Sequence, residues 1–237
     1  MKMKNRLKLD WCSFKAAKYA CEHWHYSRKI PLGKLVKIGV WEIGKFKGVI
    51  IYSMGTNKNR GSEVGIDPLE TCELTRVALR EHETPVSRLI RISLKLLKMK
   101  CPGIRLVVSY ADKNQNHLGK IYQASNWVYV GESPPTYLVK YKGEWVHSRS
   151  VRTSLLGFGG KIEDNPKIGE YIRSLPKKRI RGKFKYLYPL DPSLRDKVEA
   201  LRKPYPKKIS DGSDLVDTPG IHPGKGGSIP TPSLQII

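Results

Sequence analysis

The residues best placed to do chemistry follow a short apolar run in the middle of the chain. Residues 104–108, IRLVV, are apolar except for Arg105 and mostly β-branched, which predicts a buried strand. Ser109, Tyr110 and Asp112 come directly after it, where such a strand would reach water. Open α/β sheets place their ligands and reactive groups at these carboxyl ends of strands. The alternative is a plain strand–loop–helix unit in which Asp112 serves only as a helix N-cap.

A second candidate is Arg76, which lies inside an alternating segment, residues 71–79, that predicts another strand. The alternation places Arg76 on the face of Leu74 and opposite Glu73. Burying a guanidinium without a partner is costly. We therefore expect Arg76 to meet an anion, either the carboxylate of Asp112 or Glu73 or an anionic group of a bound ligand.

The elements around these residues predict an α/β (α+β) fold, with a mixed central sheet flanked by helices over residues 1–156. Apolar periodicity predicts a first helix from Asp10 or Ser13, a hairpin of 36–43 and 49–54, helices starting near 85 and 118, a strand at 127–130, and a final hairpin of 137–142 and 145–153. A flexible hinge at 157–160 then leads into a basic C-terminal extension, residues 157–209, with a short helix at 192–201. Residues 210–237 are rich in Gly and Pro and are expected to form a disordered tail.

The charge of the chain points to a polyanionic partner. Lys and Arg number 44 against 21 Asp and Glu, a formal net charge of +23. A basic protein kept soluble by its charge is the other explanation, but such an excess most simply indicates DNA or RNA. Cations interleaved with Tyr and Phe in the extension suit phosphates and bases. The nucleic-acid-binding candidates are Lys177, Lys178, Arg179, Arg181, Lys183 and Lys185.

Other features of the sequence indicate a cytoplasmic protein without a membrane span. No apolar run approaches the roughly 18 residues that a span requires, and the basic N-terminus lacks the apolar core of a signal peptide. Cys12, Cys21, Cys72 and Cys101 show no C-x-x-C spacing and are expected to be reduced thiols.

Four short motifs in order resemble the Mom family of bacteriophage DNA-modification proteins. They are His25-Tyr26-Ser27-Arg28, Glu73-Leu74-Thr75-Arg76, Ser109-Tyr110-Ala111-Asp112, and the helix residue Tyr122. The resemblance covers residues 15–150 and implies a GNAT acyltransferase fold, in which the strands at 71–79 and 104–110 splay apart to admit an acyl donor. It also implies that the protein modifies the N6 amine of adenine in double-stranded DNA with a carbamoylmethyl (glycinamide-type) group. The modification protects phage DNA from host restriction.

The resemblance also assigns roles to residues. Asp112, Tyr122, Arg76 and Ser109 become the catalytic candidates, with Tyr122 as a proton donor, a role that suits a phenol better than that of a base. The cofactor acetyl-CoA would meet Val77, Leu79, Ser87 and Arg88. Iron would find nitrogen and oxygen ligands in His25, Tyr26 and Asp112.

One segment departs from the family's fold pattern. GNAT enzymes bind the CoA pyrophosphate with a glycine-rich turn, whereas residues 80–88 contain no glycine and include Glu81 and Glu83. Simple acetyl transfer would also put a carbonyl, and not a methylene, on the adenine nitrogen. Glycyl-tRNA is therefore a rival donor to acetyl-CoA. A protein of a different class, a non-catalytic nucleic-acid-binding protein on a degenerate GNAT scaffold, remains the alternative function.

Overall fold

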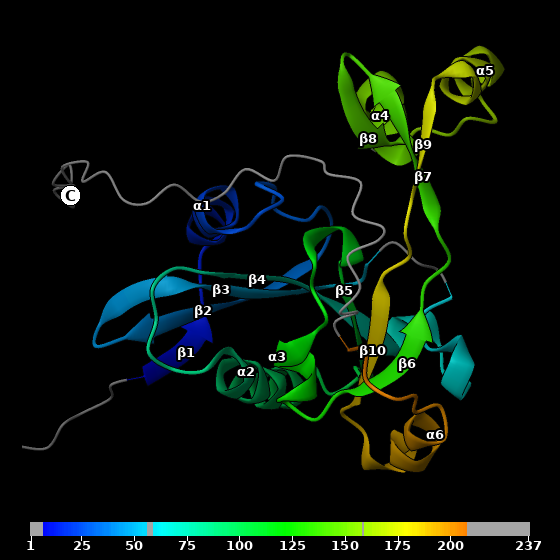
Figure 1. The fold of residues 1–237 in the computed structure, drawn as a ribbon. Helices are drawn as coiled ribbons and strands as arrows, with labels where there is room; N and C mark the ends of the chain where they lie inside the picture. The colour runs from blue at the N-terminus through cyan, green and yellow to red at the C-terminus, as the bar shows by residue number, and fades with distance from the viewer. Residues whose placement is uncertain (1–6, 56–58, 158, 208–237) are drawn as a thin grey trace, which may run out of the picture. The chain divides into compact units, whose positions relative to one another are not determined.

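The computed structural model of the chain describes residues 7–55, 59–157 and 159–207. Its centre is a seven-stranded sheet with the order β1-β2-β3-β4-β5-β10-β6 (Figure 1). Neighbouring strands are antiparallel except β4 and β5, which run parallel. The predicted mixed α/β sheet is confirmed. Its strands are β1 (Leu7–Trp11), β2 (Leu35–Glu42), β3 (Lys45–Ser53), β4 (Thr71–Leu79), β5 (Leu106–Ala111), β6 (Val128–Glu132) and β10 (Phe184–Pro189).

Helices lie on both sides of the sheet (Figure 1), and the contacts made by the side chains of β3 agree with this. Val49 and Ile51 pack against α1 (Phe14–Trp24), whereas Ile50 and Tyr52 belong to the larger cluster formed with α2 (Val86–Lys100) and α3 (Lys120–Gln123). Successive strand residues point to opposite faces, so α1 and the α2–α3 pair lie on opposite sides. The predicted flanking helices are confirmed.

Local capping explains where α1 starts. Ser13 is its N-cap, and the Ser13 side chain accepts a hydrogen bond from the backbone N–H of Ala16 at 3.1 Å. One of the two predicted starts is thus confirmed. The remaining short helices are α6 (Arg195–Glu199), inside the predicted 192–201 helix, and single turns at Ser62–Val64, Pro68–Glu70, Lys113–Gln115 and Pro192–Leu194.

The C-terminal extension differs from the expectation of a separate basic segment. Its β10 lies between β5 and β6 in the central sheet and pairs with both. The described residues up to Lys207 accordingly belong to one compact unit. The strand was missed because it follows a basic run whose cations and interleaved aromatic residues were interpreted as a nucleic-acid-binding composition. The expected tail, 210–237, lies outside the described residues.

A second, three-stranded sheet carries the residues between β6 and β10. Its order is β8-β7-β9, formed by β7 (Thr136–Tyr141), β8 (Glu144–His147) and β9 (Lys177–Ile180). Val139, Val151 and Ile172 join this sheet to α4 (Ser148–Leu156) and α5 (Pro166–Ser174). The predicted strand 145–153 is wrong beyond His147, because Val151 is buried from a helix and not from a strand.

Two hydrogen bonds join the chain segments that lead from the central sheet into this small sheet and back. The Ser133 backbone N–H donates to the Lys183 carbonyl at 2.8 Å, and the Lys183 backbone N–H donates to Ser133 Oγ at 2.9 Å.

Within the described ranges, no helix combines the length and the apolarity needed to cross a membrane.

Candidate active site

β4 and β5 separate part-way along their length. Their parallel register covers four residue pairs and ends with Leu74 opposite Ser109. Beyond that point β4 continues to Leu79 beside β3, and β5 continues to Ala111 beside β10. The divergence predicted for these two strands is therefore present, and we call the opening between them the notch.

A β-bulge in β4 decides which side chains meet at the notch. Ile51 of β3 pairs with Arg76 while Tyr52 pairs with Leu74, which leaves Thr75 as the extra residue. The bulge reverses the alternation beyond Thr75. Arg76 therefore shares a face with Glu73, the face covered by α1, and the expectation that it shares a face with Leu74 is wrong.

The guanidinium of Arg76 is held by backbone carbonyls. Its Nε donates to the Lys29 carbonyl at 3.2 Å and its Nη1 to the Thr75 carbonyl at 2.7 Å. The ion pair expected with Asp112 or Glu73 is not among those of the described residues. The fixed cation still sets the electrostatics of this face, where it acts on both Glu73 and Tyr26.

Asp112 pairs with Lys183, the residue just before β10, and not with Arg76. Its Oδ2 lies 3.1 Å from Lys183 Nζ, and its Oδ1 accepts the backbone and side-chain N–H groups of Asn114 at 3.0 and 3.1 Å. Burial raises the pKa of Asp112, but Lys183 and the Asn114 hydrogen bonds outweigh it and hold that pKa below its ordinary value. Asp112 is thus both the predicted N-cap and an ionised group at the end of β5.

Ser109 and Tyr122 meet on the opposite face of the notch. Ser109 is fully buried and donates to the Leu74 carbonyl at 2.9 Å, which ties β5 to β4 where they part. The Tyr122 hydroxyl interacts with Ser109, which lowers the pKa of the phenol, and its ring contacts those of Trp127 and Tyr186. Burial raises the pKa of Tyr122 to about 12, with Tyr26 and Glu73 adding to the effect. The phenol therefore stays protonated at neutral pH, so it can donate a proton but cannot act as a base.

Sequence reasoning missed Glu73 as a site residue. A Cβ placed on Gly55, which has a φ of +62°, would lie 2.6 Å from Glu73 Oε2, so the loop backbone closely covers this carboxyl group. Burial raises the pKa of Glu73 although Lys183, Arg76, Arg60 and Arg149 act in the opposite sense. The available signal was that Glu73 belongs to the same sequence motif as Arg76. The two side chains share a face of the sheet only because of the bulge at Thr75.

The three residues expected to bind iron do not fit that role. His25 Nδ1 accepts the Ser27 backbone N–H at 3.1 Å, so its neutral ring carries the proton on Nε2 and has no lone pair to offer there. Burial, then Arg76 and His117, lower the pKa of His25 to about 4. Both oxygens of Asp112 already accept hydrogen bonds. The structure places Tyr26 beside His25 and His117, and we derive no step through iron.

The turn before α2 holds an internal carboxylate. Glu42 is only 4% exposed, and its oxygens accept the backbone N–H groups of Glu83 and Thr84 at 2.9 and 2.8 Å. A CoA pyrophosphate at this turn would need those donors and would meet a negative charge. Ser87 and Arg88 lie in the first turn of α2, and the side chains of Val77 and Leu79 pack into the core. The turn does not fit a pyrophosphate, and we derive no step through CoA.

The predicted nucleic-acid-binding residues fall into two groups. Lys177, Lys178, Arg179 and Arg181 are exposed on β9 and just after it. Lys183 and Lys185 instead form ion pairs with Asp112 and Glu63. Nucleic-acid binding by these residues stays a prediction, and Lys183 and Lys185 already have carboxylate partners.

Comparison with known proteins places the chain in a family. The sequence model of the Mom protein family matches residues 6–207. This chain belongs to the Mom family. Among curated relatives of this Mom protein is "Methylcarbamoylase mom" of Escherichia phage Mu, which is 26% identical over 211 residues, covering 85% of this chain and 84% of the relative.

Solved structures resemble this Mom protein at low identity. A chimera of Vibrio cholerae spermidine N-acetyltransferase with hSSAT is 9% identical, with a TM-score of 0.43, over 78% of this chain and 96% of the other. The spermidine N-acetyltransferase of Vibrio cholerae in complex with CoA and spermine is 10% identical, with a TM-score of 0.42 over the same shares.

Proposed function

We propose that this protein transfers a carbamoylmethyl group to the N6 amine of adenine in double-stranded DNA, at the notch between β4 and β5. Its membership of the Mom family and the methylcarbamoylase of phage Mu support the reaction. In the bacterial cytoplasm, such a modification would shield phage DNA from restriction. The observation that carries the proposal is Glu73, which shares a face with Arg76 at the notch and acts electrostatically on the phenol of Tyr122 on the opposite face.

The two perturbed groups fit opposite halves of a transfer reaction. Bond formation between N6 and carbon releases one amine proton, whatever the donor. Glu73, whose pKa burial raises, accepts that proton. Tyr122, with its pKa raised to about 12, donates a proton to the leaving group.

Asp112 has a different part in this scheme from the one its position in sequence suggested. Because Lys183 and Asn114 keep the pKa of Asp112 low, it is a weak proton acceptor. It instead holds Lys183 beside the notch and presents a fixed negative charge near Tyr26. Asp112 and Lys183 orient the adenine, and Ser109 fixes the Tyr122 hydroxyl.

For the donor we propose an activated two-carbon acyl group, with acetyl-CoA and glycyl-tRNA as the candidates. Acyl transfer alone bonds N6 to the carbonyl carbon and releases the thiol of CoA or the 3′-hydroxyl of the tRNA. With a glycyl group, the carbamoylmethyl product then forms when the glycyl amine replaces N6 on the purine, which leaves N6 as the terminal amide; an acetyl group would need a further nitrogen source and an oxidant. The carboxylate of Glu42 at the turn before α2 weighs against a donor whose pyrophosphate binds there.

A non-catalytic nucleic-acid-binding protein is the second candidate function, favoured by the net charge of +23. Mass spectrometry of nucleosides separates the two. DNA from bacteria that express the protein is digested and compared with DNA from cells carrying the empty vector. We expect a new adenine nucleoside, heavier by one carbamoylmethyl group. Unmodified adenine throughout, with DNA binding retained, would favour the non-catalytic function.

A further inference from the structure

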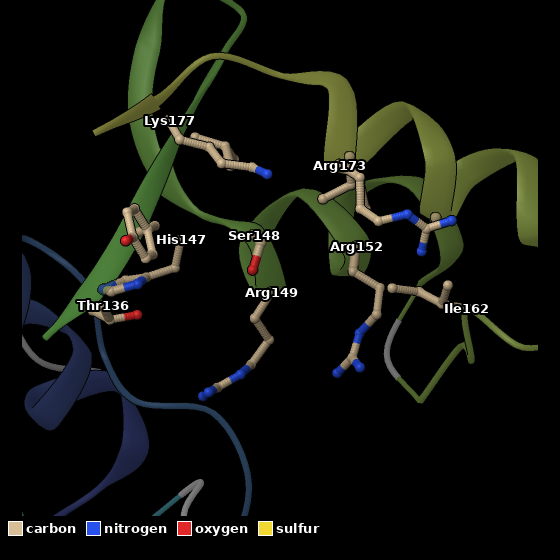
Figure 2. Close-up of a pocket in the computed structure, with 12 residues that line it drawn as sticks. Thr136, His147, Ser148, Arg149, Arg152, Ile162, Arg173 and Lys177 are labelled. Atoms are coloured by element: carbon tan, nitrogen blue, oxygen red, sulfur yellow. The ribbon is translucent and has the colours of Figure 1, made fainter. Parts of the chain in front are cut away.

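A basic cavity opens in the small sheet, outside the notch. It has a volume of about 770 Å³ and lies between the end of β8, α4, α5 and the start of β9. Figure 2 shows its cationic side chains coming from three different elements. They are Arg149 and Arg152 of α4, Arg173 of α5 and Lys177 of β9. No residue that lines the cavity is acidic.

The cations of this cavity are available to a ligand. Arg149, Arg173 and Lys177 are exposed and Arg152 is half-buried. The salt bridges found within the described part of the chain include none of the four. None of the four has a carboxylate partner among these salt bridges, whereas Lys183 and Lys185 are already paired with carboxylates.

The backbone adds donors at the same place. α4 starts at Ser148, and its N-cap, His147, makes no side-chain capping bond. Both residues line the cavity, so the first turn of a nine-residue helix, with the positive end of its dipole, forms part of the cavity wall. Tyr137, which is 52% exposed, adds an aromatic ring to the lining.

Electrostatics connect the cavity to the notch. Arg149 acts on the carboxyl group of Glu73 and lowers its pKa. Burial lowers the pKa of His147, the charge of Lys183 lowers it further, and the charge of Asp112 raises it. An anion in the cavity would thus act electrostatically on the groups to which we assign the chemistry.

We propose that this cavity binds backbone phosphates of the DNA strand that carries the target adenine, beside the nucleotide that enters the notch. This inference rests on the proposed function. An adenine inside a stacked duplex must be extruded before its N6 amine can react. Several cations on one side of the extruded nucleotide hold the backbone in its displaced path and leave the base free to enter between β4 and β5.

Binding of a fluorescent DNA duplex, measured by anisotropy over a series of salt concentrations, tests the proposal. The cavity variant is Arg149→Gln, Arg152→Gln and Arg173→Gln combined. The matched control removes three exposed cations of α2, with Arg91→Gln, Lys95→Gln and Lys98→Gln, so that net charge is equal. Each lost phosphate contact reduces the log–log salt slope by about 0.9. We expect a reduction of about 2.7 for the cavity variant and little change for the control.

Further variants and ligands keep the outcomes distinct. Replacing the same three arginines with lysine keeps the charge and should restore most of the slope, which separates phosphate binding from a folding defect. An unchanged slope in the cavity variant, or an equal loss in the control, would overturn the proposal. Binding and slope loss seen with duplex RNA of the same sequence but not with the DNA duplex would overturn the proposal and assign the cavity to RNA. Nucleoside analysis of the wild type reports separately on the modification reaction.

Discussion

The carboxylate of Glu42 should stabilise the fold strongly, because it satisfies two backbone N–H groups at the turn before α2. Burial raises the pKa of Glu42, but the hydrogen bonds from Thr84 and Glu83 outweigh it and lower that pKa from 4.5 to about 2. One pKa unit corresponds to about 1.4 kcal/mol, so the shift corresponds to roughly 3 kcal/mol at neutral pH. Solvent near the exposed Glu83 screens part of this, and we expect Glu42→Gln to cost about 2 to 3 kcal/mol.

The pH dependence identifies the cause. The folded pKa lies below the unfolded one, so the stabilisation is complete above about pH 4.5 and disappears as the pH falls towards 2. Urea unfolding followed by circular dichroism should therefore show a gap between wild type and Glu42→Gln at pH 7 that shrinks to less than half at pH 3. Glu81→Gln is the control, since Glu81 is exposed in the same turn. A gap that is independent of pH, or equal losses in the two variants, would refute this reasoning.

Three further predictions concern the notch and the donor. Tyr122→Phe should remove most DNA modification while the thermal midpoint stays within a few degrees, because the ring still packs against Trp127 and Tyr186; full activity in nucleoside analysis would mean that the phenol only packs. Lys183→Met should raise the pKa values of Asp112 and Glu73, since Lys183 lowers both; carboxyl NMR titration checks this, and unchanged titrations would contradict the assigned electrostatics. Feeding labelled glycine or labelled acetate, then weighing the modified adenine, decides the donor: label from acetate alone excludes the glycyl route, and label from glycine nitrogen and carbons excludes acetyl-CoA.

Local sequence patterns predicted much of the fold. β4, α2, β5 and α3 were anticipated from apolar periodicity and breaker residues, which depend on neighbours along the chain. β10 was not, because its place between β5 and β6 depends on pairing with distant strands. The strand that became β8 was predicted too long for a related reason. Val151 is buried by packing against Ile172, a residue distant in sequence, and not by continuing the strand.

The sequence predicted which residues belong to the site better than it predicted which residues they contact. Asp112, Tyr122, Ser109 and Arg76 all lie at or beside the notch, yet the partner of Asp112 proved to be Lys183, which sequence spacing could not reveal. The bulge at Thr75 has the same character, because a register shift is a property of two strands together. It alone brings Glu73 and Arg76 to one face.

Glu73→Gln tests the central claim most directly, because stability and activity should move in opposite directions. A carboxyl group whose pKa is raised by burial destabilises the fold once it ionises, so its removal should leave the thermal midpoint at pH 7.5 unchanged or higher. Nucleoside mass spectrometry of DNA from cells expressing this variant should at the same time show little or no carbamoylmethyl adenine. Modification at the wild-type level by a folded Glu73→Gln protein would contradict the assignment of the notch as the active site.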